Sequence, residues 1–391
     1  MRVYWHDEVL AHDTGAGVFD QPPTPLIDVP ELHPENPERI RNIRSALRNG
    51  PIAPHLEWHA GRHATREELE LIHPPSYIDS VEAACASGPA IVTQSTPVVP
   101  ASWGAALASA GTALAATEAV LAGECDQAYA LVRPPGHHCQ PAQADGYCLF
   151  SNAALCAELA RRRGIDRVAV VDWDVHHGNG TQECFWTRPD VVTISLHMGH
   201  GSWGPHHPQT GAPDELGEGD GAGRNVNVEL PLGTGDEGYR RAWARVVEPL
   251  LGTFDPGLLV IACGQDASQY DPNGRMSVTT DGFRNLGAAA RRFADAHCGG
   301  RLVLVQEGGY GRTYSAFCMH ATLEGVLGTG KLLDDPVAYL PDDRDRGDAA
   351  IDTHMRPLGS YWLASWPQAI TSRPGSNAPR SGSTTRAQAR R

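Results

Sequence analysis

Five short apolar runs, spaced along the chain and rich in β-branched residues, constrain the fold more than any other feature of this sequence. Each run is apolar along nearly its whole length, which is typical of strands that are buried on both faces, as in a parallel sheet. The runs cover residues 127–132, 167–172, 191–197, 257–263 and 301–306.

Ala-rich stretches that favour helices lie between these runs, at residues 103–121, 152–163, 238–251 and 281–296. Alternating strands and helices predict an α/β fold with a central, mostly parallel sheet that is flanked by helices. In such sheets ligands bind beyond the carboxyl ends of the strands. Polar residues that directly follow an apolar run are therefore the first candidates for a functional site.

Composition restricts the class of protein. With 41% hydrophobic and 20% charged residues the chain is typical of globular proteins, and its 391 residues allow one large or two ordinary domains.

The segment 371–391 is rich in Ser, Pro, Gly and Arg, which predicts a disordered tail. The Gly-, Pro- and His-rich segment 199–223 predicts a long loop that forms a rim or lid over the strand ends.

Charge and cysteine usage exclude several functions. A net charge of −14 disfavours binding to nucleic acid. The chain has neither a basic start followed by an apolar run nor an apolar run of about 18 residues, so we expect a cytoplasmic protein without a membrane span. Nine cysteines without a Cys-x-x-Cys pair argue against a disulfide scaffold or a cysteine-based zinc site, and we expect most of them to be buried.

The run 167–172 leads into a candidate metal site. Asp174 and His176 are two residues apart, so their side chains fall on the same side of an extended backbone. Asp266, which follows the run 257–263, is the natural third ligand. A set of oxygen and nitrogen donors without cysteine is typical of a catalytic rather than a structural site, and it accepts zinc or ferrous iron.

Acid–base candidates follow two other runs. His137 and His138 come after Pro-Pro-Gly, a rigid turn that would fix both rings, and Asp172 and Asn179 flank the metal segment as partners for the imidazoles. Tyr310 follows two glycines, where a phenol can approach a reacting carbonyl and donate to a developing oxyanion.

Each signal alone has a structural explanation, such as a turn with a packed ring or a helix cap, but four of them at four strand ends favour one shared site. The other histidines lack ligand spacing, and for them we expect surface or packing roles. They are His6, His12, His33, His55, His59, His63, His73, His297 and His320. His197, His200, His206 and His207 are candidates for the mouth of the site, with a solvated loop as the alternative.

The segments RPPGHH, DGYCLFSNAA, VDWDVHHGNGTQ, TISLH, GQDASQYDPNGRM and QEGGY, in this order, resemble the signature segments of the histone deacetylase superfamily. The resemblance extends from about residue 5 to 340 and is strongest to class II deacetylases and bacterial deacetylase-like amidohydrolases. It implies a single arginase-like catalytic domain, which we place at residues 1–370. The implied reaction is hydrolysis of an N-acyl amide, and an N-acetyl amide is the expected substrate.

The resemblance also implies roles for individual residues. Zinc is bound by Asp174, His176 and Asp266, and His138 is the general base and then acid. His137, paired with Asp172, is its electrostatic neighbour, and Tyr310 polarises the acyl carbonyl.

Further positions follow from the same resemblance. Asn179 matches class II, and Tyr310 matches competent hydrolases, since the weakly active class IIa branch has histidine there. The Gly146 carbonyl receives the substrate amide N–H, and Tyr147 and Trp203 wall the acyl tunnel, with Asn273 at its rim and Gly309 beside Tyr310. Arg39 matches an arginine of an internal channel. A structural potassium ion is implied at Asp172, Asp174, His176, Ser195 and Leu196.

Three departures concern the substrate. Gln265 replaces an aromatic residue before the metal aspartate, and Asn273 stands where a polyamine-specific relative has glutamate. The second tunnel wall reads Ser202-Trp203-Gly204-Pro205 instead of a Phe-Phe pair. Acetyl-lysine, an acetylpolyamine and another small acylated amine are therefore all open as substrates, and a homo-oligomer is expected because bacterial relatives often form one. The alternatives are a non-catalytic protein that binds acylated ligands and a ureohydrolase on the same fold.

Overall fold

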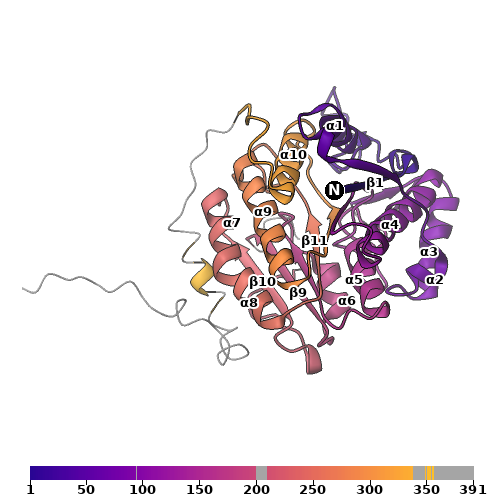
Figure 1. Ribbon diagram of the computed structural model, residues 1–391. Helices are drawn as coiled ribbons and strands as arrows, with labels where there is room; N and C mark the ends of the chain where they lie inside the picture. Colours follow the sequence, from indigo (N-terminus) through magenta and orange to yellow (C-terminus); the bar gives the residue numbers. More distant parts are fainter. Residues whose placement is uncertain (94, 200–208, 338–347, 349, 354, 356–391) are drawn as a thin grey trace, which may run out of the picture.

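The centre of the molecule is an eight-stranded sheet in which every pair of neighbouring strands is parallel, in the order β10-β9-β8-β11-β12-β7-β1-β4 (Figure 1). This computed structural model describes residues 1–93, 95–199, 209–337, 348, 350–353 and 355. In chain order the strands are β1 (Arg2–Trp5), β4 (Glu57–Ala60), β7 (Gln127–Ala130), β8 (Val168–Asp172), β9 (Val191–Met198), β10 (Asn225–Leu230), β11 (Leu258–Cys263) and β12 (Leu302–Gln306).

Helices and two small antiparallel ribbons surround this sheet. The ribbons pair β2 (Ala16–Gly17) with β3 (Glu31–Leu32) and β5 (Ala90–Thr93) with β6 (Thr96–Val98). The α-helices are α1 (Pro37–Asn49), α2 (Arg66–Leu69), α3 (Pro75–Ala86), α4 (Pro100–Leu121), α5 (Asn152–Arg162), α6 (Asn179–Phe185), α7 (Asp236–Ala242), α8 (Glu248–Phe254), α9 (Thr280–His297) and α10 (Tyr314–Leu327). The shorter helical segments are η1 (Asp7–Leu10), η2 (Ala53–His55), η3 (Gly219–Gly221) and the π-helical turn η4 (Trp243–Val247).

Both faces of the sheet are buried, and alternate residues of each strand serve different cores. In β11, Leu259 and Ile261 pack with residues of α7 to α10, while Leu258 and Val260 pack with residues of α4 and α5. The two groups of helices lie on opposite sides of the sheet (Figure 1). This arrangement explains why the strands are apolar at every position, because a strand with two buried faces has no solvent side.

The predicted fold class is confirmed, and all five predicted strands are present with ends shifted by no more than two residues. Three further strands of the central sheet, β1, β4 and β10, were not predicted, because β1 and β4 are short and the polar residues of β10 interrupt its apolar pattern. The helix predicted at 238–251 is in fact α7, η4 and α8 in succession. Residues 371–391, for which we predicted a disordered tail, lie outside the described part of the chain.

All nine cysteines are free, and seven of them are buried, as their pattern predicted. Among the described helices, α4 has the length and apolarity that a membrane span requires, but 72% of its apolar window is buried inside the fold. Its apolarity is therefore explained by packing against the sheet and α5.

The packing of α9 against α10 supports one prediction about stability. A Cβ atom at Gly287 of α9 would lie 2.2 Å from the carbonyl oxygen of Thr322 in α10, and backbone cannot yield as a flexible side chain can. We expect Gly287→Ala to lower the free energy of unfolding by about 1–3 kcal/mol, measured by urea denaturation, because overpacking outweighs the gain in helix propensity.

Gly252→Ala is the matched control. A Cβ at Gly252 in α8 meets no atom within 4 Å, so this change should raise stability by about 0.5–1 kcal/mol. Equal effects of the two substitutions would contradict the proposed close contact between α9 and α10.

Candidate active site

A cluster of three ligand-type side chains lies where β8 and β11 end. Asp174 and His176 follow β8, and Asp266 follows β11, so the parallel pairing of the two strands brings their carboxyl ends together. One ligand atom from each residue lies within 4.8 Å of the others, and all three side chains are buried. The structure thus assembles the three predicted metal ligands.

The charges in this cluster fit a divalent cation. His176 Nδ1 lies 3.1 Å from Asp174 Oδ1 and 3.2 Å from Asp266 Oδ2, and that Asp266 oxygen is buried without a hydrogen-bond partner. Burial and the neighbouring Asp174 carboxylate raise the pKa of Asp266 to about 8. Two buried carboxylates that share one imidazole need further positive charge, and a metal ion would supply it.

The backbone around the cluster leaves space for an ion. A Cβ atom at Gly308 would lie 2.2 Å from Asp266 Oδ2 and 2.6 Å from Asp174 Oδ2. At Gly264 it would lie 2.3 Å from Asp174 Oδ2. Gly308 N–H donates to Asp174 Oδ2 at 2.8 Å, so glycine lets the backbone come close enough to orient this carboxylate.

Two adjacent imidazoles lie beside the cluster and have different partners. His137 Nδ1 is 2.8 Å from Asp172 Oδ2, whereas His138 Nδ1 is 2.7 Å from the amide oxygen of Asn179. Burial opposes the charged form of both rings. For His137 the carboxylates of Asp174 and Asp172 outweigh burial and hold the pKa well above its usual value. For His138 burial, reinforced by His137 and His176, holds the pKa well below it.

A buried acid fixes the turn that carries both rings. Glu307, which directly follows β12, accepts the backbone N–H groups of Gly136 at 2.7 Å and His137 at 3.1 Å. Burial raises the pKa of Glu307 to about 7.

Tyr310 faces the cluster from the loop after β12. Its ring centroid is 6.4 Å from that of His176 and 5.7 Å from that of Tyr147, and burial raises the pKa of the phenol well above its usual value. The Asp271 carboxylate accepts the backbone N–H of Tyr310 at 2.6 Å and of Gly311 at 2.9 Å. Asp271 therefore positions the loop on which Tyr310 stands.

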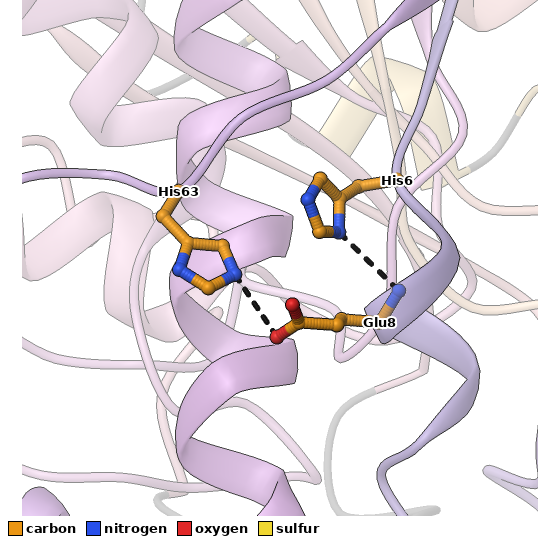
Figure 2. Close-up of side chains that lie close together, drawn as sticks. All are labelled: His6, Glu8 and His63. Carbon is orange, nitrogen blue, oxygen red and sulfur yellow. Dashed lines mark hydrogen bonds and ion pairs between the residues drawn. The ribbon is translucent and has the colours of Figure 1, made fainter.

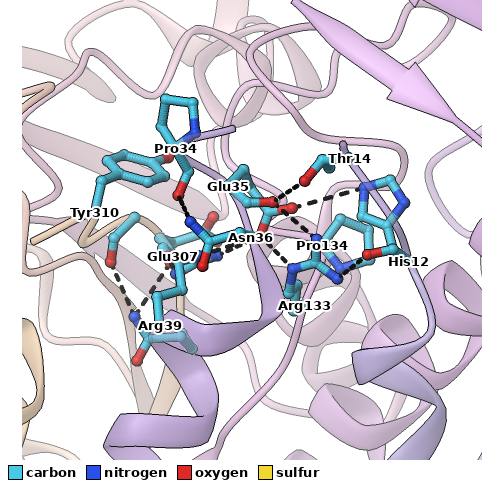
Figure 3. A network of polar contacts seen from close by, with 12 residues as sticks. His12, Thr14, Pro34, Glu35, Asn36, Arg39, Arg133, Pro134, Glu307 and Tyr310 are labelled. Carbon is cyan, nitrogen blue, oxygen red and sulfur yellow. Dashed lines mark hydrogen bonds and ion pairs between the residues drawn. The ribbon is translucent and has the colours of Figure 1, made fainter. Parts of the chain in front are cut away.

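A network of buried charges supports Tyr310 from below (Figure 3). Glu35 Oε1 lies 2.8 Å from Arg39 Nη2 and 2.8 Å from Arg133 Nε, and all three side chains are fully buried. Arg39 also donates to the carbonyl oxygen of Glu307, and its guanidinium carbon is 5.4 Å from the centroid of the Tyr310 ring. Arg39, which the resemblance placed in an internal channel, thus lies directly beneath Tyr310.

The structure describes all of the predicted substrate-binding residues except Trp203. Gly146 has a φ of +47°, and a Cβ there would lie 2.2 Å from the His138 ring, so only glycine fits. Tyr147 is buried beside Tyr310, and Asn273 is a hydrogen-bonding neighbour of its phenol. Gly309 has a φ of +121°, a backbone conformation that favours glycine, and it sets the direction in which the chain enters Tyr310. Trp203 and its neighbours at 202, 204 and 205 lie outside the described residues.

Gln265, one of the departures in the sequence, is fully buried and bonded within the protein. Its amide nitrogen donates to the Cys263 carbonyl oxygen at 3.0 Å, and its amide oxygen accepts from Gln306 at 2.8 Å. The residues predicted for potassium also come together, since Asp172 and Ser195 are paired across β8 and β9 and Leu196 follows.

Four positioning residues escaped the sequence analysis: Glu35, Arg133, Asp271 and Glu307. Glu307 carried a usable signal, since it stands at a strand end next to the Gly-Gly-Tyr segment. Asp271 lies inside a signature segment but next to a proline, which favours a turn. Glu35 and Arg133 are distant in sequence, and nothing local marks them as a buried pair.

Comparison with known proteins gives a consistent result. Residues 33–326 match the model of the histone deacetylase domain. The chain is 50% identical over 355 residues to histone deacetylase 8 of Arabidopsis thaliana, which covers 90% of this chain and 94% of that protein. It is 41% identical over 338 residues to a histone deacetylase-like amidohydrolase of Pseudomonas aeruginosa, covering 85% and 88%.

Two further similarities concern substrate and fold. The polyamine deacetylase HDAC10 of Homo sapiens is 36% identical over 312 residues, or 78% of this chain and 46% of that protein. The crystal structure of the HDA15 HD domain superposes with a TM-score of 0.80 at 30% identity, covering 93% of this chain and 97% of that one. The family model covers most of this chain and the Arabidopsis and Pseudomonas relatives match it over nearly their whole length, so this chain belongs to the histone deacetylase family.

Proposed function

We propose that the chain hydrolyses N-acetyl amides with a zinc ion held by Asp174, His176 and Asp266, and that ferrous iron is the alternative metal. The observation that carries this proposal is the buried cluster of two carboxylates and one imidazole, which are oxygen and nitrogen donors of a catalytic site. When bound, the ion supplies Lewis acidity toward the acyl oxygen and the attacking water.

The two histidines divide the proton chemistry between them. His138, whose pKa is low, is neutral and takes the proton of the attacking water at Nε2, because its Nδ1 is held by Asn179. It later gives this proton to the leaving amine. His137, whose pKa is high, stays protonated between Asp172 and Asp174 and contributes positive charge next to the reaction centre.

Tyr310 stabilises the oxyanion that develops at the acyl carbonyl. Its phenol keeps its proton, since burial raises the pKa, and it is therefore a hydrogen-bond donor at neutral pH. The carbonyl of Gly146 receives the substrate amide N–H, and Tyr147 walls the acyl tunnel, with Asn273 at the rim.

For the substrate we propose an acylated primary amine such as acetyl-lysine, an acetylpolyamine or another small acylated amine. Relatives named as histone deacetylases and as a polyamine deacetylase support both of the first two classes. Further proposals are a structural potassium ion at Asp172, Asp174, His176, Ser195 and Leu196, a cytoplasmic location, a homo-oligomeric state and no binding to nucleic acid or membrane.

The family match disfavours a ureohydrolase. A protein that only binds acylated ligands would be expected to lack a catalytic element. The described residues include the metal ligands, both histidines and the tyrosine.

Tyr310→Phe tests the proposed function. Zinc-loaded wild type should cleave at least one of a fluorogenic acetyl-lysine peptide, its trifluoroacetyl analogue and N-acetylputrescine. The variant should lose about 10²–10³-fold in kcat because one oxyanion donor is missing. Zinc content and Tm equal to those of wild type serve as controls for the fold. A variant that keeps the wild-type kcat, or a zinc-loaded wild type that cleaves none of the three, would contradict the mechanism.

The pH profile tests the role of His138. Asn179 also donates to Asp145 at 3.3 Å, so the comparison is best made between Asp145→Asn and the double variant Asp145→Asn/Asn179→Asp, which avoids two facing carboxylates. A carboxylate on His138 Nδ1 raises the pKa of the ring. Since the neutral ring is the base, the acid limb of kcat/KM should move to higher pH, by about one unit or more. An unchanged acid limb would show that another group is the base.

A further inference from the structure

A second group of metal-ligating side chains, His6, Glu8 and His63, lies close together (Figure 2). It is at the same carboxyl edge of the parallel sheet as the catalytic cluster, but beyond β1 and β4, which are the last two strands in the strand order. His6 and Glu8 follow β1, and His63 follows β4, which is the neighbouring edge strand. The N–H of Gly61 donates to the carbonyl oxygen of Trp5 at 2.7 Å and joins the two segments just beyond the strand ends. The parallel pairing of β1 with β4 thus gathers these residues, as the pairing of β8 with β11 gathers the catalytic ones.

The three side chains converge on one space. One ligand atom from each lies within 4.8 Å of the others. His63 Nε2 is 3.0 Å from Glu8 Oε2, and the ring centroids of His6 and His63 are 5.1 Å apart. Figure 2 shows both rings on the same side of the Glu8 carboxylate.

The backbone under this group is firmly held. Val9, next to Glu8, is fully buried, and its carbonyl oxygen accepts from the buried Arg133 at 3.2 Å. On the other side, a Cβ at Gly104 of α4 would lie 2.6 Å from Glu8 Oε2, so the carboxylate occupies space that a side chain would otherwise fill. The backbone that carries Glu8 is therefore fixed, while the side chains of Glu8 and His63 are exposed and can turn toward an ion.

A surface ion pair between Glu8 and His63, with His6 as the N-cap of η1, is the simpler explanation of these contacts. It accounts for Glu8 with one histidine and for the backbone contact of His6, but it does not use the position of the two rings side by side, with centroids 5.1 Å apart. The contact between His6 Nδ1 and the N–H of Glu8 is long, at 3.3 Å, so little is lost when the ring turns. A divalent cation would bind the two imidazoles and the Glu8 carboxylate at the same time.

We infer that His6, Glu8 and His63 form a second metal site, which is separate from the catalytic cluster. It binds a divalent transition-metal ion, and zinc is the ion that we expect most. Two imidazoles and one carboxylate are donors for zinc and related ions, whereas calcium and magnesium prefer oxygen ligands alone. Bonds of about 2.0–2.1 Å require the ligand atoms to come closer than they are here, which rotations of partly exposed side chains can supply. The net charge of −14 favours the arrival of a cation.

The strand order shows that the two sites are distinct. Three strand-to-strand steps separate β11, which carries Asp266, from β1, which amounts to about 14 Å. An ion at the second site would therefore not touch the reacting atoms. It would tie the loop after β1 to the loop after β4 at the edge of the sheet.

Zinc titration of the full-length, chelator-treated protein by calorimetry tests this inference. The variants are His6→Gln and His63→Gln, and the matched control is His55→Gln, which removes an exposed histidine outside the group. Wild type and the control should bind one equivalent of zinc more than either variant. The Tm of the variants should no longer respond to the added second equivalent, while deacetylase activity with the catalytic site loaded stays at the wild-type level.

The comparison does not depend on the catalytic cluster, because the tested quantity is the difference of one equivalent between variants and control. The same zinc stoichiometry in wild type, control and both variants would overturn the inference. So would a loss of that equivalent in the control as well.

Discussion

Buried negative charge at the carboxyl edge of the sheet is the constraint on which the rest of this structure depends. Five acids are buried there, at the end of β8 or on the loops that leave β8, β11 and β12: Asp172, Asp174, Asp266, Asp271 and Glu307. Removing a carboxylate from water is costly unless hydrogen bonds or opposite charge compensate. The way in which each of these acids is compensated determines the architecture of the active site.

Most of the acids are compensated by the protein itself. Asp172 is paired with His137, Glu307 accepts backbone N–H groups at the Gly136 turn, and Asp271 accepts those of the Tyr310 loop. Asp174 and Asp266 share one imidazole, His176, and so carry more negative charge than the protein neutralises. The same pattern of compensation that rigidifies the site therefore leaves one place that fits a cation.

The opposite pKa shifts of His137 and His138 follow from this charge distribution. Both rings are buried and their centroids are only 3.9 Å apart, so burial alone would make both neutral. The carboxylates of Asp174 and Asp172 make His137 a stable cation, while burial and the neighbouring His137 and His176 keep His138 neutral and free to accept a proton. The different surroundings of two adjacent rings thus separate an electrostatic role from an acid–base role.

The sequence predicted the parts of this arrangement that depend on local pattern. Strands buried on both faces are visible as apolar runs, and Asp174, His176, Asp266, His137, His138 and Tyr310 stand directly after such runs. Glu35 and Arg133 could not be predicted in the same way, because their pairing depends on tertiary packing between segments that are 98 residues apart. The sequence analysis assigned His6 and His63 surface or packing roles. Their proximity depends on the pairing of β1 with β4, and because neither strand was predicted, it could not be foreseen.

The central claim is that the Asp174, His176 and Asp266 side chains together hold one metal ion, and anomalous diffraction tests it most directly. Crystals of the protein loaded with one equivalent of zinc would be measured on both sides of the zinc absorption edge. The account predicts one strong anomalous peak within about 2.0–2.3 Å of a ligand atom from each of the three residues. A peak elsewhere with this cluster empty, or two ions bridged within it, would contradict the account.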